Sequence, residues 1–389
     1  MKVLIIGISV RSMAGSAFKS GYSVVALDAF GDQDLKTMAE AYSLRRDFHT
    51  VYSPDNLFKA SRDLAFDAVA YTSNLENYPE VIARFSKSHR IFGNTHQTVS
   101  SVRRWPELFE KLRRAGFSVP ETVFAGEPLP SDSKNLWLKK PLLSGGGHGI
   151  RYCRPKAESP VGNEGTFKTE GCMLQQYIPG RPCSAAFVAN GKNSVLLGIA
   201  EQWIGMTTLG ARDFQYCGNL LPIPEMCNPD RGKEILNEIR RLTDFLSGEF
   251  GLCGVNGIDF VLCDGRVYLT EVNPRYSASM EIIEIAYGLP IFQMHVQSIL
   301  NSRLPEFDLE SEISCSRFYG KCYLYAEKDV TMPDTGLWIR KTIRDVPASG
   351  ERMGKGAPIC TILAEGPTRM DTFTVMTRRA EKLREEIYG

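Results

Sequence analysis

The chain has 389 residues, which is long enough for two or three domains and a large hydrophobic core. Its 46 Lys and Arg residues balance 45 Asp and Glu residues, so no strong overall charge recruits nucleic acid or an acidic membrane surface. A hydrophobic content of 43% and a charged content of 23% are typical of an ordinary soluble globular protein.

The ten cysteines are scattered and form no Cys-x-x-Cys pair, so the spacing of a structural zinc site is absent. The apolar stretch at residues 3–10 is short and is followed by Arg11 and a helix-like run, unlike a secretory signal. We therefore expect a cytoplasmic protein whose thiols are reduced.

The N-terminal segment alternates strands with helices. Residues 1–10 have the continuous apolar character of a strand buried on both faces of a parallel sheet. A helix is predicted at 12–20, and further strands at 22–27, 68–71 and 91–93. This order predicts a Rossmann-like sheet. Gly7 and Gly15 are eight residues apart, so the glycine fingerprint of a bound dinucleotide is missing.

Arg11 lies in the loop after the first strand, between Ser9 and Ser12. A substrate could reach this loop. A plain surface charge is nevertheless the interpretation that we favour for Arg11.

Residues 96–116 are predicted to form one helix. Trp105, Leu108, Phe109 and Leu112 follow one another at helical spacing, and Gly116 is a candidate C-cap.

A glycine-rich stretch follows at residues 136–153. A short apolar strand ends in Lys139 and Lys140, and the loop after it contains Gly145, Gly146, Gly147 and Gly149. Glycines let backbone N–H groups surround a phosphate, and a lysine beside them adds positive charge. No Gly-Lys-Ser/Thr follows, so this is not a P-loop. Alone, the stretch fits a flexible surface loop equally well.

The next segment contains strands at 185–188 and 194–201 around an Asn-Gly turn, and a helix at 232–250. Between them lies a polar and aromatic loop at 210–224. Arg212, Tyr216 and Asn219 of this loop are plausible substrate contacts.

Residues 251–279 read as a hairpin with strands at 255–262 and 267–272. Alternation along the first strand turns Asp259 away from Ile258 and Phe260. On the second strand, Leu269, Glu271 and Asn273 share a face. If the strands pair, Asp259, Glu271 and Asn273 converge as hard oxygen ligands suited to Mg²⁺. The alternative is an ordinary hairpin with a polar, wet face.

Arg275 follows this hairpin, directly before a helix predicted at 277–284. Its planar guanidinium could hold a carboxylate or a phosphoryl group bidentately beside the metal. Alternatively, Arg275 pairs structurally with Glu281 or Glu284.

The C-terminal segment changes character. Strands are predicted at 317–326, 336–342 and 357–364, with a charged helix at 372–388.

Taken in order, these motifs resemble the ATP-grasp superfamily, and the C-terminal segment resembles its biotin-carboxylase-like branch. The resemblance rests on the lysine-proline strand with its glycine loop, a hinge at 173–180, and the segments 257–260 and 271–275. It implies an α/β fold with a Rossmann-like N-terminal domain, a two-part ATP-grasp domain and a small β-rich C-terminal domain. The implied bounds are 1–95, 96–305 with a lid at about 123–176, and 306–389 with a terminal helix.

The resemblance also implies roles for individual residues. Lys140, Gly145, Gly146, Gly147 and His148 would contact the phosphates of ATP. Gln175 and Gln176 stand where the family usually places an acid near the adenine amino group, and Tyr177 and Ile178 would supply backbone groups and an apolar wall. Arg103 or Arg104 would replace a lysine that approaches the phosphates in relatives; we assign Arg104 and leave Arg103 open to a solvated role.

Asp259, Glu271 and Asn273 would hold Mg²⁺ or Mn²⁺, and Arg275 and Lys140 would act in catalysis. The implied function is an ATP-dependent carboxylate–amine ligase, with cofactor biosynthesis as one setting, that proceeds through an acyl phosphate and releases ADP and phosphate. A carboxylase using bicarbonate and a non-catalytic ATP-binding protein are the alternatives. The expected partners are small-molecule carboxylates and amines, without nucleic acid or membrane, and a homodimer is left open.

Overall fold

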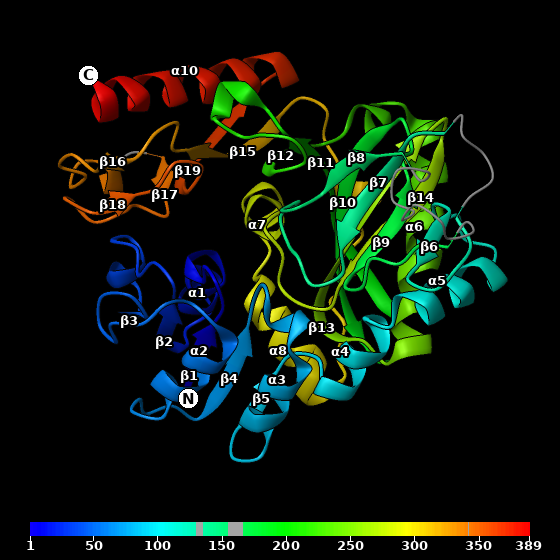
Figure 1. The fold of residues 1–389 in the computed structure, drawn as a ribbon, viewed down its shortest axis with the longest axis horizontal. Helices are drawn as coiled ribbons and strands as arrows, with labels where there is room; N and C mark the ends of the chain where they lie inside the picture. Colours follow the sequence, from blue (N-terminus) through cyan, green and yellow to red (C-terminus); the bar gives the residue numbers. More distant parts are fainter. Residues whose placement is uncertain (130–134, 155–165, 341) are drawn as a thin grey trace.

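The computed structural model describes residues 1–129, 135–154, 166–340 and 342–389. Figure 1 shows the N-terminal sheet below, a long mixed region of strands beside it, and the C-terminal helix above. Within these residues, no helix combines the length and the apolar character needed to cross a membrane.

The first sheet is parallel, with strand order β3-β2-β1-β4-β5. Its strands are β1 (Lys2–Ile6), β2 (Ser23–Asp28), β3 (Glu40–Ser43), β4 (Ala68–Tyr71) and β5 (Arg90–Phe92), and its helices are α1 (Arg11–Lys19), α2 (Pro54–Ser61) and α3 (Pro79–Ser86), with short η1 (Leu35–Thr37) and η2 (Leu75–Asn77). This order is the Rossmann-like one, as predicted. The short, polar edge strand β3 was not foreseen.

The helix predicted at 96–116 is two helices, α4 (His96–Val102) and α5 (Trp105–Arg114). Pro106 lies in the first turn of α5, where its missing N–H costs nothing, but it cannot continue a helix from upstream. The apolar stripe of α5 is buried in the central core, as its spacing indicates.

The strands on either side of the glycine-rich loop belong to a four-stranded antiparallel sheet, in the order β6-β9-β7-β8. Its strands are β6 (Thr122–Phe124), β7 (Trp137–Pro141), β8 (Arg151–Cys153) and β9 (Cys172–Gln176). The predicted lid at 123–176 contains this sheet. Residues 130–134 and 155–165 of that range lie outside the described residues.

The largest sheet has eight strands, in the order β14-β13-β10-β11-β12-β15-β19-β17. They are β10 (Arg181–Asn190), β11 (Ser194–Ile204), β12 (Tyr216–Leu221), β13 (Cys253–Cys263), β14 (Arg266–Asn273), β15 (Phe318–Tyr325), β17 (Ile343–Arg344) and β19 (Pro358–Gly366). Because β12 pairs with β15, this sheet runs across the predicted domain boundary at residue 306. The confirmed fold class is α/β.

Helices cover both faces of this sheet. They are α6 (Pro229–Phe250), α7 (Met280–Tyr287), α8 (Ile291–Asn301), α9 (Leu309–Glu312) and α10 (Arg369–Tyr388), with short η4 (Thr207–Leu209) and η5 (Pro224–Cys227). One core lies between α5, α6 and the sheet, and a second joins α7 and α8 to the N-terminal sheet. A third core packs α10 on β15 and β19.

One prediction for the C-terminal segment is wrong, and so is the expectation that all thiols of the chain are reduced. The expected strand at 336–342 is instead the 3-10 helix η6 (Trp338–Arg340), whose Trp338 is buried and donates to Glu386 at 2.8 Å; residue 341 is not described. A small ladder of β16 (Val330–Thr331) and β18 (Arg352–Met353) flanks it. The thiols are not all reduced, because Cys227 and Cys315 form a disulfide with Cα atoms 5.7 Å apart.

Candidate active site

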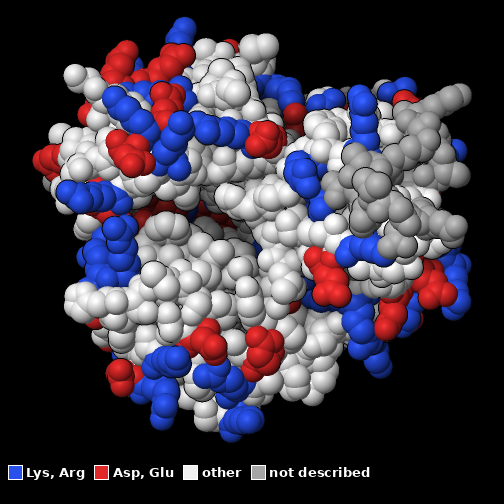
Figure 2. All heavy atoms as spheres, in the orientation of Figure 1, with Lys and Arg blue, Asp and Glu red and all other residues white. Residues whose placement is uncertain are grey.

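A cavity of about 720 Å³ lies where the N-terminal sheet, the lid, the central sheet and the C-terminal strands meet. Its wall includes residues from every one of these parts. Figure 2 shows the molecule hollowed between the N-terminal and C-terminal parts, with acidic side chains in the depth of the hollow. This is where the predicted site residues must be sought.

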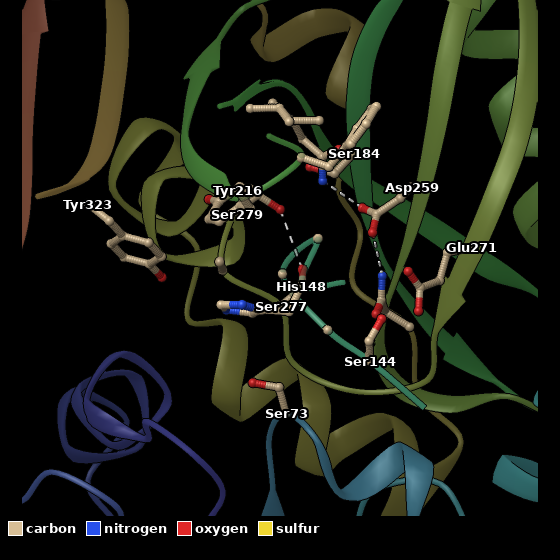
Figure 3. Close-up of a pocket in the computed structure, with 18 of the residues that line it drawn as sticks. Ser73, Ser144, His148, Ser184, Tyr216, Asp259, Glu271, Ser277, Ser279 and Tyr323 are labelled. Atoms are coloured by element: carbon tan, nitrogen blue, oxygen red, sulfur yellow. Dashed lines mark hydrogen bonds between the residues drawn. The ribbon is translucent and has the colours of Figure 1, made fainter. Parts of the chain in front are cut away.

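The hairpin of β13 and β14 places two carboxylates on one wall. Asp259 pairs in register with Glu271, and Gly257 pairs with Asn273. The register shifts after Asp259, and Phe260 pairs with Leu269, so Leu269 turns into the core. The prediction that Leu269 shares a face with Glu271 is therefore wrong. Figure 3 shows Asp259 and Glu271 side by side on adjacent strands.

Asp259 is held by two amides. Gln202 donates to its Oδ1 at 2.8 Å, and Asn273 donates to its Oδ2 at 2.9 Å. Burial, followed by the charge of Glu271, raises the pKa of Asp259 to about 6, although the hydrogen bond from Asn273 acts against the shift. A divalent cation between the two carboxylates would remove their repulsion, so this donor set fits a hard metal ion.

The guanidinium of Arg103 forms an ion pair with Glu271. It donates to Oε1 of Glu271 at 2.9 Å and to the backbone oxygen of Leu142 at 3.0 Å. Arg104 instead lies at the surface and pairs with Glu107 at 2.7 Å. The structure thus brings Arg103, and not the assigned Arg104, to the carboxylate pair, because the break between α4 and α5 turns the two side chains apart.

Lys140 lies at the end of β7 on the cavity wall. Burial lowers the pKa of its ammonium, against the charges of Glu271 and Asp259, which raise it. Its Nζ donates to Oε1 of Gln175 at 3.0 Å. Lys140 therefore donates to a neutral amide oxygen, and a charged phosphate oxygen would be a stronger hydrogen-bond acceptor.

The predicted hinge also lines the cavity. Its lining residues are Gln175 and Gln176 at the end of β9, and Tyr177 and Ile178 directly after this strand. The Oε1 atom of Gln175, predicted to face adenine, here accepts from Lys140, and its Nε2 donates to Thr122 at 3.3 Å. The N–H of Tyr177 donates to Leu136 at 2.8 Å. The amide of Gln175 and the N–H of Tyr177 would have to give up these hydrogen bonds to contact an adenine ring.

The glycine loop closes on the connection between β11 and β12. The N–H of Tyr216 donates to the oxygen of Gly146 at 2.9 Å. Gly147 has φ +80°, and a Cβ atom there would lie 1.8 Å from the backbone oxygen of Phe214. The cavity is lined by Gly145, Gly146, Gly147 and His148, so this loop forms part of its wall.

Arg275 is anchored from the N-terminal sheet side. It donates from Nε to Oε1 of Glu76 at 2.9 Å and from a terminal nitrogen to Oδ1 of Asn273 at 3.0 Å. Glu281 and Glu284, the alternative partners, instead contact Lys321 and Lys19. Arg275 is thus buried beside the carboxylate pair.

The predicted loop at 210–224 contains strand β12, and two of the three predicted residues lie on this strand rather than in a loop. Tyr216 and Asn219 line the cavity, and Asn219 is held by a hydrogen bond of 3.1 Å to the oxygen of Glu201. Arg212 is exposed and lies outside the cavity lining.

A charged cluster at the far end was missed. Arg11 is buried and pairs with Glu281 from α7 and with Asp345 after β17, so its interpretation as a surface charge is wrong. Lys321 of β15 is also buried and donates to Glu281 at 2.7 Å. In the sequence, the only sign of a functional role for Arg11 was its position beyond the carboxyl end of β1, where ligands approach open sheets.

Comparisons with known proteins agree with this geometry. A family model described as an ATP-grasp domain matches residues 106–279. Protein MJ0776 of Methanocaldococcus jannaschii is 23% identical over 94% of this chain and 88% of its own length. The carbamoyl phosphate synthase large chain of Clostridium beijerinckii is 24% identical over 58% of this chain, which spans 21% of that protein.

Solved structures share the whole fold. The biotin carboxylase domain of Hydrogenobacter thermophilus 2-oxoglutarate carboxylase, solved with MgADP and bicarbonate, has a TM-score of 0.69 at 16% identity and covers 99% of this chain and 90% of its own. The L-amino acid ligase of Bacillus licheniformis has a TM-score of 0.68 at 15% identity, with coverages of 99% and 97%. N5-carboxyaminoimidazole synthetase of Staphylococcus aureus has 0.64 at 15%, with coverages of 100% and 97%.

Proposed function

We propose that this chain, which belongs to the ATP-grasp superfamily, is an ATP-dependent enzyme that joins a small-molecule carboxylate to an amine and releases ADP and phosphate. The observation that carries the proposal is the meeting of two carboxylates and two partly buried cations on one cavity wall: Asp259, Glu271, Lys140 and Arg275. Relatives that act on ATP with such a fold include both ligases and carboxylases.

Asp259, Glu271 and the amide oxygen of Asn273 would hold Mg²⁺ or Mn²⁺. When bound, the ion would neutralise charge on the phosphates of ATP. For Asn273, this requires its Oδ1, which now accepts from Arg275, to face the ion. The raised pKa of Asp259 supports the assignment, because a carboxylate pair in a buried site favours either a proton or a metal.

The remaining residues would position and neutralise the reacting groups. Lys140 would exchange Gln175 for a phosphate oxygen, and the glycine loop would cover the phosphates and exclude water. Arg275 would hold the substrate carboxylate in line with the γ-phosphoryl group. One carboxylate oxygen attacks phosphorus, ADP leaves, and the amine then displaces phosphate from the acyl phosphate to give the amide.

A carboxylase that uses bicarbonate is the second candidate. The guanidinium of Arg275 is a planar fork that would hold bicarbonate as well as an organic carboxylate. Its place next to Asn273 therefore supports both reactions.

The first experiment is a calorimetric titration of the full chain with a non-hydrolysable ATP analogue, with and without Mg²⁺. The variants are Glu271→Gln and Lys140→Ala, and Arg104→Ala is the matched surface control. We expect metal-dependent binding that the first two substitutions weaken at least tenfold and that the control leaves unchanged. Absence of binding in folded wild-type protein would overturn the proposal.

A second experiment separates the two reactions. ADP release is measured with a panel of carboxylates, with bicarbonate alone, and with hydroxylamine as a trap. Hydroxamate formation with a specific organic carboxylate supports the ligase. ADP release that bicarbonate alone stimulates, without hydroxamate from any other acid, supports the carboxylase instead.

A further inference from the structure

A cluster beside the far end of the cavity contains more carboxyl groups than cations, and of its acids Asp32 and Asp345 line the cavity itself. Five acids gather there from three parts of the chain: Asp28, Asp32, Asp34, Glu281 and Asp345. Two buried cations face them, Arg11 and Lys321. This buried site thus holds an excess of carboxyl groups, whose charge must be removed by protons or balanced by a further cation.

Most of these carboxylates have their own partners. Asp28 accepts from the backbone N–H groups of Val10, Phe30 and Gly31. Asp34 accepts from the backbone of Val346 at 2.9 Å and of Asp345 at 3.1 Å.

Glu281 and Asp345 share Arg11, and Lys321 adds a bond of 2.7 Å to Glu281. The carboxylates of Glu281 and Asp345 are therefore paired with cations of the protein itself.

Asp32 differs from the others. It lines the cavity and is only 5% exposed, yet its Oδ2 has no hydrogen-bond partner among the residues that the structure describes. Burial, and then the charges of Asp345, Asp28 and Asp34, raise its pKa well above the ordinary value, while Arg11 acts in the opposite direction. A buried carboxylate with an unpaired oxygen would be stabilised by a bound cation.

The neighbouring wall is aromatic. The rings of Tyr216 and Tyr323 lie 5.5 Å apart, and those of Tyr323 and Tyr325 lie 6.4 Å apart. Phe30 lines the cavity as well. In Figure 3, Tyr323 stands on the side of the cavity opposite Asp259 and Glu271. Aromatic faces attract cations and accommodate apolar chains; Nζ of Lys321 already lies 5.3 Å from the ring centroid of Tyr323, and the other rings of this wall suit an organic cation.

We propose that Asp32 and this aromatic wall form a subsite for a primary ammonium group, which makes the amine substrate a cationic organic amine. The assignment rests on the proposed ligase function, because it names the chemical class of that reaction's amine. A metal ion is a poorer occupant, since the neighbouring carboxylates Asp28, Asp34 and Asp345 already accept hydrogen bonds from the protein.

The test uses n-butylammonium as the probe and n-butanol as its neutral counterpart, with the full chain and saturation-transfer NMR. The variants are Asp32→Asn and, as the control in the same N-terminal part of the chain, Asp63→Asn, at an exposed position in the turn after α2. We expect butylammonium to bind wild type and Asp63→Asn equally, to bind Asp32→Asn at least tenfold more weakly, and butanol not to bind. Melting curves show that each variant is folded, and Asp32→Ser replaces Asp32→Asn if the latter does not fold.

Nucleotide binding is measured on the same samples, so the two proposals fail separately. Bound nucleotide with no butylammonium binding, or with equal binding to Asp32→Asn, would overturn the ammonium subsite and leave the enzyme proposal standing. Displacement of butylammonium by Mg²⁺ alone would assign the subsite to a metal. Asp32-dependent butylammonium binding without nucleotide binding would support the subsite and overturn the enzyme proposal.

Discussion

Arg103 donates a hydrogen bond of 2.9 Å to Glu271 across 168 positions of sequence. It is also stacked over the ring of Trp105, with its guanidinium carbon 4.6 Å from the ring centroid. Arg103 therefore fixes the orientation of Glu271 in the carboxylate pair, and the break between α4 and α5 makes this contact geometrically available.

Replacing Arg103 by Ala should weaken Mg²⁺-dependent nucleotide binding by tenfold or more. The substitution leaves Glu271 without its cation and brings two carboxylates into uncompensated contact. Arg104→Ala should change the affinity by less than twofold, because Arg104 is a surface residue paired within α5. Calorimetry on both variants checks this, and equal losses would show that the effect is general.

Gly147→Ala should lower nucleotide affinity by about tenfold. A non-glycine residue at φ +80° costs about 1–2 kcal/mol, and the added Cβ would meet the backbone oxygen of Phe214. Gly145→Ala is the matched control, since nothing lies within 4 Å of a Cβ at that position. If both variants bind nucleotide like wild type, closure of the loop on Phe214 does not contribute to binding.

His295 should make the protein less stable in mild acid. The ring is buried, its Nδ1 accepts from the N–H of Val255 at 2.8 Å, and its Nε2 lies 3.0 Å from the oxygen of Phe92. Burial lowers the pKa of His295 from 6.5 to about 4. The unfolded chain therefore binds the proton first, and stability decreases as the pH falls from about 6.5 to 4.

Between pH 7.5 and 5 this one group should contribute a loss of about 2 kcal/mol in the free energy of unfolding. Urea titrations of wild type and His295→Gln at both pH values measure the difference. The variant should lose less stability than wild type by that amount, whereas the exposed control His49→Asn should follow wild type. Identical pH dependence in all three proteins would contradict the buried neutral imidazole.

Reducing agent should lower the melting temperature of the wild type. The disulfide between Cys227 and Cys315 closes a loop of 88 residues, and such bridges stabilise by about 2–4 kcal/mol. The double variant Cys227→Ser/Cys315→Ser should melt at the lower temperature with or without reductant. Cys263→Ser, which removes a free thiol, should respond like wild type. A wild type indifferent to reductant would show that the bridge does not form in solution.

The sequence predicts best what depends on neighbours along the chain. The alternation of β13 and β14 was sufficient to bring Asp259 and Glu271 together, because both residues belong to one hairpin. The bulge beside Thr270 was not visible, since it adds one residue without any glycine or proline to mark it. Leu269 was misplaced for that reason.

Contacts between distant segments were out of reach. Arg11 meets Asp345 across 334 positions, and no local pattern states which acid an N-terminal arginine will find. The choice between Arg103 and Arg104 depended on where α5 begins, which Pro106 fixes within one residue. The pairing of Cys227 with Cys315 required the fold of the six intervening elements from α6 to α9.

The buried pairs of Arg11, Glu281, Lys321 and Asp345 join the N-terminal sheet, α7 and the C-terminal strands at a single point. Pulling any one of these parts away would leave bare charges in the interior, at a cost of several kcal/mol. Three walls of the cavity are consequently held together by charge, and the lid sheet contributes none of these pairs. The size of the substrate would then be limited by the walls that these pairs hold in place.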